Sequence, residues 1–251
     1  MHWIYLSPHL DDVALSCGGL IWQQSQAGAR VEVWTLCAGD PPPGAVSPFA
    51  ESLHARWGAA QQAVAQRRAE DAASCRILGA SWRHFSIPDC IYRREANGGW
   101  LYACNDALFG GLHPADADWI EQTAQLIAQA PSAAKIVAPL ALGGHVDHQL
   151  VSAALKRCGR KAWRYADYPY VLTAAEQLDE MRRSGLRRRR FALSEAAMAA
   201  WVRAVAAHAS QISSFWADLT AMEAALREYA AQNQGIVLWR AACKAALRSA
   251  G

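Results

Sequence analysis

Two short stretches of the sequence concentrate side chains that can bind a metal ion or transfer a proton. Residues 7–12 read Ser-Pro-His-Leu-Asp-Asp, and residues 143–148 read Gly-Gly-His-Val-Asp-His. Imidazole nitrogens and carboxylate oxygens both suit zinc, and a catalytic zinc site keeps a fourth position for water. His9, Asp12 and His148 would form such a site, with two histidines and one carboxylate.

A base beside the metal would complete a hydrolytic site. Asp11 adjoins Asp12, and successive side chains in a turn point in different directions, so Asp12 can hold the metal while Asp11 takes a proton from the metal-bound water. His145 precedes His148 by three residues, which at the start of a helix places both imidazoles near one face. His145, kept protonated by a carboxylate such as Asp147, could stabilise an oxyanion or donate a proton to a leaving amine.

Each of these residues also has an ordinary structural interpretation. Asp11 or Asp12 could cap a helix that begins at Val13, and His145 or Asp147 could cap the helix that follows the second stretch. For any one residue alone this interpretation is favoured. Two clusters rich in ligand residues, both at predicted strand ends, favour the chemical interpretation.

Apolar segments before both clusters predict the strands that would position them. Residues 3–6 (Trp-Ile-Tyr-Leu) and 136–140 (Ile-Val-Ala-Pro-Leu) are short apolar runs typical of buried strands. Residues 31–36 form a second strand after a helix that ends near Gly28, and such βαβ units are nearly always right-handed and parallel. Ligands bind beyond the carboxyl ends of strands in open α/β sheets, so we expect the two clusters to meet there over one metal ion.

The remaining segments predict a single α/β domain over residues 1–251, with a core built from a chain that is 53% hydrophobic. A helix is expected from about residue 59 to Leu78, with Gly79 as its C-cap. The irregular segment 88–115 is long enough to be a functional loop. Further strands are expected over residues 82–87 and 163–166, and further helices from Asp116 to before Pro131, over 147–158, from Ser194, along the apolar stripe 212–229 and after Gly235.

Composition argues against several classes of protein. The net charge of +3 is too small to imply a nucleic-acid partner, and no apolar run approaches the length of about 20 residues that spans a bilayer. We expect no signal peptide, because the first strand begins without a charged segment and a separate apolar segment before it. The seven cysteines lack CxxC spacing, so we expect a cytoplasmic protein with reduced thiols rather than a Cys90–Cys104 disulfide. The six arginines of residues 182–190 are expected in a solvated loop or helix end, although such a run could also contact phosphate, anionic lipid or nucleic acid.

Both clusters resemble the signatures of one enzyme family. Residues 8–12 and 144–148 are similar to the PHPDD and HPDH motifs of the PIG-L/LmbE-like zinc-dependent N-acetylglucosaminyl deacetylases. The likeness covers most of the chain in the family's order. Its supporting elements are Arg67-Arg68 with Glu70-Asp71, Pro88-Asp89, the segment 167–170 (Asp-Tyr-Pro-Tyr) and Ser210-Gln211.

The resemblance implies a Rossmann-like three-layer α/β sandwich with a mostly parallel central sheet and no dinucleotide site, and no GxGxxG follows the first strand. It assigns zinc binding, one ion per chain, to His9, Asp12 and His148, a ligand set that iron(II) also accepts. It makes Asp11 the general base. It makes His145 the group that polarises the amide or stabilises the tetrahedral intermediate.

The sequence departs from the family pattern at four positions. Leu10 and Val146 replace the prolines of the two motifs without removing a ligand. Val13 stands where the family usually carries glutamate. Gly143 stands where some members carry a tyrosine near the oxyanion, a contact that Tyr168 or Tyr170 could supply instead.

Together these features predict a metal-dependent hydrolase that removes an N-acetyl or other acyl group from an amino sugar or its conjugate. One alternative is an amidase acting on a thiol-sugar conjugate through the same metal chemistry. Another is a sugar-binding protein of the same fold that has lost turnover. A base beside the metal argues against the second alternative, because binding alone needs no base.

Sugar hydroxyl groups need charged or amide partners, for which we consider Arg68, Asp89 and Tyr168. Arg68 is about equally well explained as a surface residue, and Arg67 is expected to pair with Asp71 on the helix surface. Three aromatic residues of the loop could stack on a sugar or simply cover the loop: Tyr92, Trp100 and Tyr102.

Overall fold

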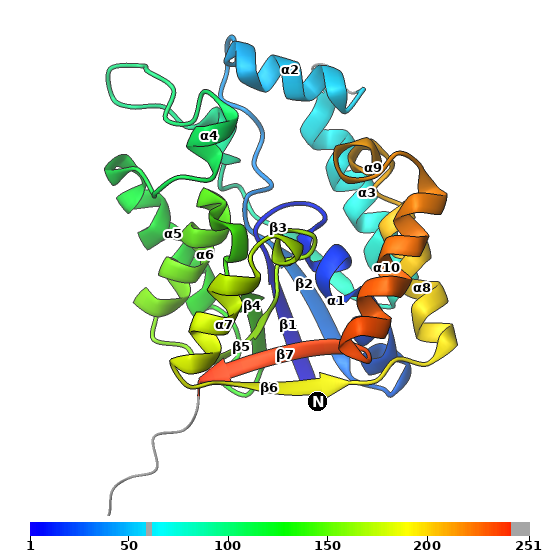
Figure 1. Ribbon diagram of the computed structural model, residues 1–251. Coiled ribbons are helices and arrows are strands. Elements are labelled where there is room, and N and C mark those ends of the chain that lie inside the picture. Colours follow the sequence, from blue (N-terminus) through cyan, green and yellow to red (C-terminus); the bar gives the residue numbers. More distant parts are fainter. Residues whose placement is uncertain (59–61, 242–251) are drawn as a thin grey trace, which may run out of the picture.

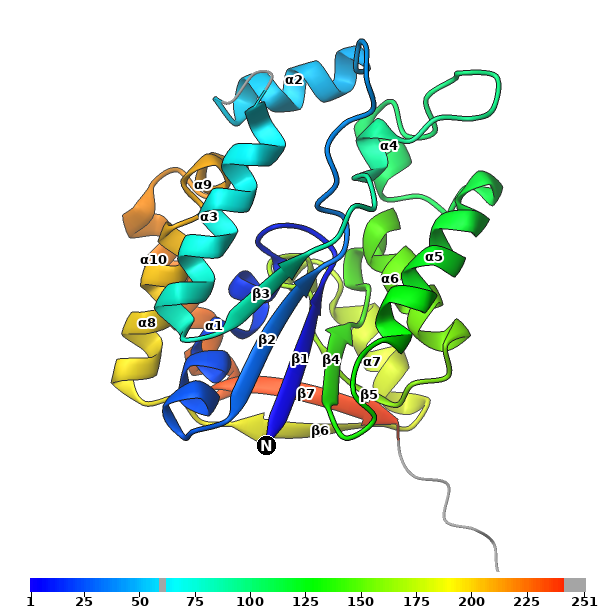
Figure 2. The ribbon, with the colours of Figure 1, turned by 180° about the vertical axis from the view of Figure 1, so that it is seen from behind.

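The computed structural model describes residues 1–58 and 62–241. Within these residues the strands form one seven-stranded sheet in the order β3-β2-β1-β4-β5-β7-β6 (Figures 1 and 2). The strands from β1 to β5 are mutually parallel, whereas β7 runs antiparallel to both of its neighbours. Their bounds are β1 (His2–Ser7), β2 (Arg30–Thr35), β3 (Ser81–His84), β4 (Lys135–Pro139), β5 (Ala162–Tyr165), β6 (Leu186–Phe191) and β7 (Ile236–Ala241).

Helices cover both faces of this sheet and produce three layers (Figures 1 and 2). One face carries α1 (Asp12–Gln26), α3 (Ala63–Leu78), α8 (Glu195–Ala206) and α10 (Leu219–Asn233), and the other carries α5 (Ala117–Ala128) and α6 (Val146–Arg157). The shorter elements are α2 (Pro48–Arg56), α4 (Asn105–Leu108), α7 (Ala175–Arg183), α9 (Ala209–Phe215) and the 3-10 turns η2 (Cys90–Tyr92), η3 (Pro114–Asp116), η4 (Leu142–Gly144) and η5 (Tyr170–Leu172). The α/β fold class and the mostly parallel sheet are therefore confirmed.

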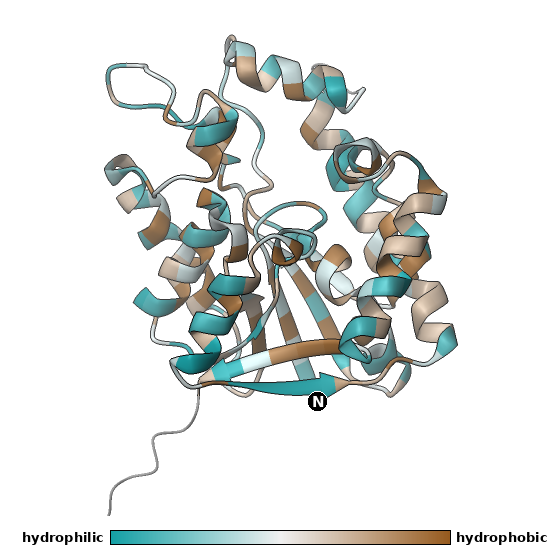
Figure 3. Ribbon diagram, in the orientation of Figure 1, coloured by the Kyte–Doolittle hydropathy of each residue, from teal (hydrophilic) through white to brown (hydrophobic). Residues whose placement is uncertain are grey.

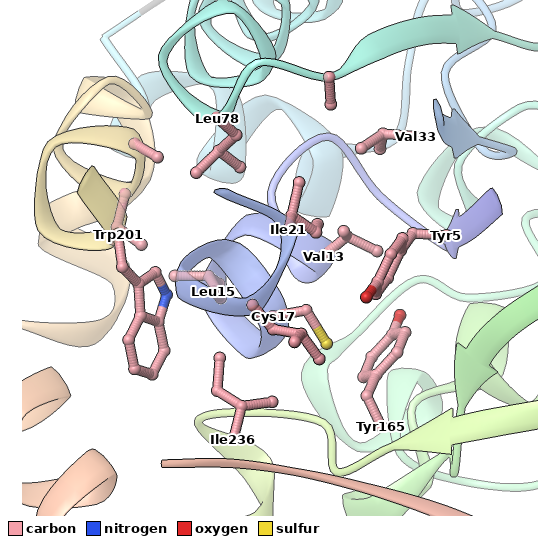
Figure 4. Close-up of a cluster of buried hydrophobic side chains, with 14 of the residues drawn as sticks. Tyr5, Val13, Leu15, Cys17, Ile21, Val33, Leu78, Tyr165, Trp201 and Ile236 are labelled. Carbon is pink, nitrogen blue, oxygen red and sulfur yellow. The ribbon is translucent and has the colours of Figure 1, made fainter. Parts of the chain in front are cut away.

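The interior strand β1 shows why an apolar segment forms a strand inside this sheet. Trp3 and Tyr5 pack into the core beneath α1 and α8, while Ile4 and Leu6 pack into the core beneath α5 and α6. Successive strand residues point to opposite faces, so a strand covered on both faces is apolar throughout. Figure 3 shows the resulting apolar interior between the layers, and Figure 4 shows the first of the two cores.

Helix α1, which begins at the first ligand cluster, is held firmly against α8. Trp201 of α8 donates a hydrogen bond from Nε1 to the Ala14 carbonyl oxygen at 2.8 Å, and its indole lies beside Leu15 (Figure 4). A Cβ atom on Gly18 would lie 2.5 Å from the Trp201 ring, so the close approach of the two helices requires glycine there. The amino end of α1 is thus a rigid support for Asp12.

The predicted elements of the C-terminal part needed correction. Residues 236–241, which directly follow Gly235, form strand β7 rather than a helix, because Ile236 and Leu238 alternate into the core with the period of a strand. The rest of the segment predicted as a helix, residues 242–251, lies outside the described residues. The apolar stripe 212–229 spans two helices, since α9 ends at Phe215 and α10 starts anew with Asp218 as its N-cap. Of the helix predicted from residue 59, the first three residues lie outside the described residues, and α3 begins at Ala63.

The arginine run is neither a loop nor a helix end over most of its length. Arg187 to Arg190 belong to β6, which pairs with β7 and forms one edge of the sheet. Positive charge along an edge strand opposes pairing with the edge of another molecule, because the like charges would meet. The run therefore has a structural role that needs no ligand.

Two predicted helix caps are confirmed. Gly79 ends α3 in the left-handed conformation with φ +68°, and Ser194 caps α8 by accepting a hydrogen bond from the Ala197 amide.

Within the described ranges, no helix combines the length and hydropathy that a bilayer span requires.

Because β1, β4 and β5 are parallel, their carboxyl ends lie at the same end of the sheet. Three segments follow these ends: the turn from β1 into α1, the turn from η4 into α6, and the segment from β5 to η5. Helices α2, α4 and α9 stand above this end of the sheet in Figure 1. Both ligand clusters therefore lie between the carboxyl ends of the strands and these three short helices.

Candidate metal centre and its cavity

The two predicted clusters meet in space, as expected. Ligand atoms of His9, His145 and His148 lie within 4.8 Å of one another, and all three residues are buried. The ring centroids of His9 and His148 are 5.5 Å apart, although the two residues are 139 positions apart in the chain. The carboxyl ends of β1 and β4 are neighbours in the sheet, so the turns that follow them converge.

Hydrogen bonds within the first turn hold its side chains in place. Ser7 donates from its hydroxyl to the His9 carbonyl oxygen at 2.6 Å and accepts from the Val13 amide at 3.2 Å. Asp12 accepts a hydrogen bond from the His9 amide at 2.7 Å. Asp11 occupies the N-cap position of α1 but makes no capping hydrogen bond. The capping interpretation therefore fails for Asp11, whose carboxylate stays available to the cavity.

Asp12 lies between two imidazoles. Its Oδ2 is 3.2 Å from His9 Nδ1, and its Oδ1 is 3.2 Å from His148 Nε2. The other nitrogen of each ring has a carboxylate of its own, with His9 Nε2 2.8 Å from Asp147 and His148 Nδ1 2.6 Å from Asp167. Such outer carboxylates fix which ring nitrogen faces a metal.

The donor set therefore fits a divalent metal ion. The Nε2 atom of His148 is buried and has no hydrogen-bond partner among the described residues, which suits an atom that binds a metal. Two imidazole nitrogens and a carboxylate turned toward one another match zinc or iron(II) chemistry. The predicted trio His9, Asp12 and His148 is brought together in this geometry.

Strong electrostatic coupling accompanies this geometry. Burial alone would raise the pKa of Asp12, but His148 and His9 hold that pKa well below its usual range. Burial would lower the pKa of His148, but Asp12 and Asp167 raise it to about 9. In the protein without metal, His148 is thus a cation that the two carboxylates stabilise, and a metal ion would take the place of its proton.

Asp11 combines burial with a nearby cation. Burial raises its pKa, and Arg67, whose Nη2 lies 3.6 Å from Asp11 Oδ2, opposes that rise without cancelling it. Arg67 also lies 3.9 Å from Asp89 and stacks over Trp57 at 4.7 Å from the ring centroid. A raised pKa favours a carboxylate that takes a proton from water and later returns it.

His145 differs from its predicted state. The carboxylate of Asp147 pairs with His9, not with His145, and the His145 Nδ1 instead accepts a hydrogen bond from the Asp147 backbone amide at 3.2 Å. Burial, followed by the neighbouring His9 and His148, lowers the pKa of His145 well below its usual value. The prediction that Asp147 keeps His145 protonated is therefore wrong. His145 is neutral, caps α6, and carries its proton on Nε2, where it can donate to a developing negative charge.

Arg93 has a role at the centre that the sequence did not predict. This arginine is 2% exposed, forms an ion pair with Asp116 at 2.8 Å and forms a second ion pair with Asp147. Asp147 also accepts from the Cys90 amide at 3.0 Å, so the 88–115 loop is anchored directly to the carboxylate that holds His9. No local pattern marks Arg93, because its two partners are distant in the chain.

A cavity of about 490 Å³ opens over this centre. Its polar lining includes Asp11, Asp89, Arg67 and Gln211. Gln211 reaches the cavity because the neighbouring Ser210 donates from its amide and hydroxyl to Glu70 of α3, at 3.0 and 2.6 Å. These bonds give the motif residues Glu70 and Ser210 a positioning role.

Two predicted substrate residues lie outside the cavity lining. Arg68 donates to the Ala38 carbonyl oxygen and to Asp40, and Tyr168 is buried between Trp216 and Tyr229. Arg67 and Tyr170 line the cavity instead. Adjacent residues on a helix point about 100° apart, so only the packing of α3 decides which arginine faces inward.

The aromatic residues of the 88–115 loop stabilise the loop. The Tyr102 hydroxyl donates to Asp116 at 2.6 Å, Trp100 stacks under Arg94, and the Tyr92 hydroxyl is bonded to His54 at 2.6 Å. These contacts fit the covering role that was considered for them.

Comparison with known proteins agrees with this geometry. The family model described as PIG-L, GlcNAc-PI de-N-acetylase, matches residues 4–158, which is more than half of the chain. A 2'-N-acetylparomamine deacetylase from Streptomyces fradiae is 31% identical over 180 residues, covering 67% of this chain and 57% of that protein. Its counterpart from Niallia circulans is 31% identical over 185 residues, covering 66% of each. The chain thus spans less than two thirds of the length of these curated relatives.

Solved structures match over nearly the whole chain. The zinc-inhibited form of a teicoplanin deacetylase has a TM-score of 0.80 and 28% identity, covering 95% of this chain and 97% of that one. A deacetylase of the A40926 pseudoaglycone has a TM-score of 0.71 and 31% identity, covering 95% and 96%. With both signature turns inside the matched segment, this protein belongs to the PIG-L family of de-N-acetylases.

Proposed function

We propose that this protein is a metal-dependent N-deacetylase that acts on an N-acetylated amino sugar within a larger conjugate. One observation carries the proposal: Asp12 lies between two imidazoles while the adjacent Asp11, bonded to neither, lines the same cavity. The deacetylase names of the relatives support it.

His9 through Nδ1, the Asp12 carboxylate and His148 through Nε2 would hold one divalent ion per chain. Zinc is the first candidate, because two imidazole nitrogens and a carboxylate suit it, and iron(II) accepts the same ligands. When bound, such an ion polarises the amide carbonyl and lowers the pKa of water. Asp147 and Asp167 orient the two imidazoles.

Asp11 acts as the base and then as the acid. It accepts a proton from the water that adds to the amide carbon and delivers a proton to the nitrogen as the C–N bond breaks, leaving acetate and a free amine. The Nε2–H of His145 donates to the carbonyl oxygen while negative charge develops there. Asp89, Arg67 and Gln211 provide charged and amide partners for sugar hydroxyls.

The experiment is acetate release by protein that has been stripped of metal with a chelator and reloaded. The panel contains N-acetylglucosamine, its methyl glycoside and a thiol conjugate of the N-acetylated sugar. We expect activity to vanish on stripping and to return fully at about one equivalent of zinc or iron(II) per chain. Preferential cleavage of the thiol conjugate would identify the amidase alternative. A protein that binds zinc and sugar but releases no acetate would contradict the proposal.

A reducing compartment such as the cytoplasm is the proposed location. The six cysteines within the described residues are free, including Cys90 and Cys104, which supports it. Fractionation of the native host cells would test it.

A further inference from the structure

A second large cavity lies at the opposite end of the sheet from the metal centre. Its volume is about 1050 Å³, and it opens where β4 and β5 begin and β7 ends. Within the described residues its lining contains no aspartate or glutamate but five basic side chains, which are Lys135, Arg160, Lys161, Arg164 and Arg240. The cavity over the metal centre, in contrast, is lined by three aspartates. The two cavities therefore suit ligands of different charge.

The pairing of the strands explains why a cavity opens here. Strand β5 pairs with β7 at only two positions, and this pairing stops at Arg164. The preceding residues Ala162 and Trp163 pair with β4 instead, while the end of β7 follows β6 as far as Ala241. Strands β5 and β7 lie together in the lower part of Figure 1. Because the two strands separate before Arg164, the cavity opens between Trp163 and the end of β7.

The two inner arginines are held in place by neutral partners. Arg160 donates from Nη1 and Nη2 to the carbonyl oxygens of Ala130 and Pro131, at 2.6 and 2.9 Å. Arg164 donates from Nη1 to the carbonyl oxygen of Pro139 at 2.9 Å and to the Ser152 hydroxyl at 3.3 Å. A carbonyl or hydroxyl oxygen fixes a guanidinium group without neutralising it. Both arginines are therefore fixed in position and keep their full positive charge.

Two more of the basic side chains follow the same pattern. The ammonium group of Lys135 lies 4.9 Å from the ring centroid of Trp3, and the guanidinium group of Arg240 lies 4.8 Å from that of Trp163. Indole rings attract cations but carry no net charge. The nearby Arg157, which does not line the cavity, instead pairs with a carboxylate, that of Glu121, at 2.9 Å. The positive charge of the cavity is therefore not balanced by its own lining.

Arg164 shows the energetic consequence. Burial lowers its pKa, because the cation loses contact with water, and Asp167 opposes that shift without cancelling it. Asp167 is itself paired with His148 at 2.6 Å. Buried charge is favourable only beside an opposite charge, so an anion that entered the cavity would stabilise Arg164.

The size and charge of the cavity indicate a ligand with more than one phosphoryl group. Each phosphoryl group carries a charge of about −1.5 to −2 and three acceptor oxygens, and a guanidinium group binds it through two parallel hydrogen bonds. One such group would leave most of the five cations unmatched. Small-molecule sites commonly have volumes of about 300–1,000 Å³, so the cavity can hold a whole molecule of this kind.

The shape of the cavity favours a discrete small molecule over a membrane surface. Lys135, Arg160 and Arg164 are partly buried, whereas Lys161 and Arg240 are exposed. The headgroups of a flat bilayer would reach the two exposed cations. A small molecule that enters the cavity can reach all five.

We propose that this cavity binds a small molecule that carries at least two phosphoryl groups, at a site separate from the metal centre. The proposal goes beyond the proposed deacetylase function and does not depend on it. Arg160 and Arg164 are the inner donors, which their carbonyl contacts hold ready. Lys161 and Arg240 are the outer donors at the opening.

Calorimetry on the full, zinc-loaded chain tests the proposal. Two pairs of probes differ by one phosphoryl group, ADP against AMP and fructose bisphosphate against fructose monophosphate, so adjacent and separated phosphoryl groups are both sampled. We expect the doubly phosphorylated probe of at least one pair to bind at least about tenfold more tightly than its counterpart, because it forms additional charge-assisted hydrogen bonds. The ionic strength is kept at about 0.15 M, where exposed charges more than about 8 Å apart are largely screened.

Variants then locate the site. Arg164→Gln should weaken binding of the doubly phosphorylated probe about tenfold, and Lys161→Gln about threefold. Lys161 is exposed, so its substitution tests the site even if Arg164→Gln does not fold. The matched controls Arg157→Gln and Arg189→Gln remove the same charge from exposed residues outside the cavity lining. Both controls should bind the probe within about twofold of the wild type.

Three results would overturn the proposal while leaving the proposed deacetylase function intact. The first is equal affinity within both probe pairs, or cavity variants that bind no more weakly than the controls. The second is binding that requires zinc but not Arg164, which would place the phosphoryl groups at the metal centre. The third is sedimentation with phosphatidylglycerol vesicles that Arg189→Gln reduces as much as Arg164→Gln does, which would assign these cations to a membrane surface.

Discussion

The floor and the mouth of the cavity are built on opposite physical principles. The floor consists of the buried lining residues His9, Asp11, Asp12, Arg67, Asp89 and His145. Its charges are matched with partners from distant segments, as His9 is matched with Asp147 and Arg67 with Asp11. At the mouth, which the apolar lining residues Leu53, Trp57, Phe109, Leu172 and Phe215 form, the side chains are only partly buried, and Phe109 and Leu172 are exposed to water. A network of buried ion pairs fixes the positions of its side chains, but removal of one partner leaves a buried charge uncompensated and destabilises the fold. Exposed apolar residues can be substituted with little loss of stability. The floor therefore determines the reaction, and the mouth determines which substrate reaches it.

The largest effect is expected from the base on the floor. Asp11→Asn keeps the size of the side chain but removes its ability to accept a proton, so kcat should fall about 10³-fold. Metal content, measured by mass spectrometry, should stay near that of the wild type because Asp12 and both histidines remain. The matched control is Asp40→Asn, which removes an exposed carboxylate that pairs with Arg68. Activity of the Asp11 variant close to that of the control would refute the assigned role.

The next effect tests whether the floor depends on partners outside the cavity. Arg93→Met leaves Asp147 buried without its cation, so we expect zinc affinity to fall about 10- to 100-fold and the free energy of unfolding to fall by about 3–5 kcal/mol. Competition with a chromophoric chelator measures the first quantity, and urea denaturation of the metal-free protein measures the second.

Arg94→Met is the control for this variant, because the adjacent Arg94 stacks on Trp100 away from the centre. Similar zinc affinities for the Arg93 and Arg94 variants would show that the floor does not need the buried ion pair.

A third prediction concerns pH. The folded metal-free protein holds the pKa of His148 at about 9, above its ordinary value near 6.5, so the protonated ring stabilises that form. This contribution is complete below about pH 6.5 and is lost as pH rises through about 9. Metal must displace the same proton, so zinc affinity should increase about tenfold per pH unit over this window. Affinity that does not change between pH 6.5 and 8.5 would be inconsistent with His148 as a ligand.

The smallest effect separates two neighbouring arginines. Arg68→Ala should change kcat/KM less than about twofold, because the pair that it forms with Asp40 is partly exposed and screened by water. Arg67→Ala, assayed in parallel, should lose activity, since Arg67 contacts both Asp11 and Asp89 on the floor. Equal losses of activity in the two variants would mean that the partly exposed Arg68 contributes to activity as much as the buried Arg67 does.

Local sequence determined the parts of this protein that depend on residue type and spacing. Two apolar runs, one before His9 to Asp12 and one before His145 to His148, predicted strands of a parallel sheet. Parallel strands have their carboxyl ends on the same side of the sheet, so the same pattern predicted that the two turns meet. The strand β7 escaped this reasoning, since a six-residue apolar segment can be helix or strand until its neighbours are known.

Tertiary structure alone decided which partner each charged group takes. Whether Asp147 orients His145 or His9, whether Arg67 or Arg68 faces the cavity, and where Arg93 lies all depend on contacts between residues far apart in the chain. The energy of a buried charge is set by the few ångströms around it, and residue order does not specify those neighbours. The sequence alone was thus enough to locate the chemistry, whereas the folded chain determined the protonation state of His145 and the apolar mouth above it.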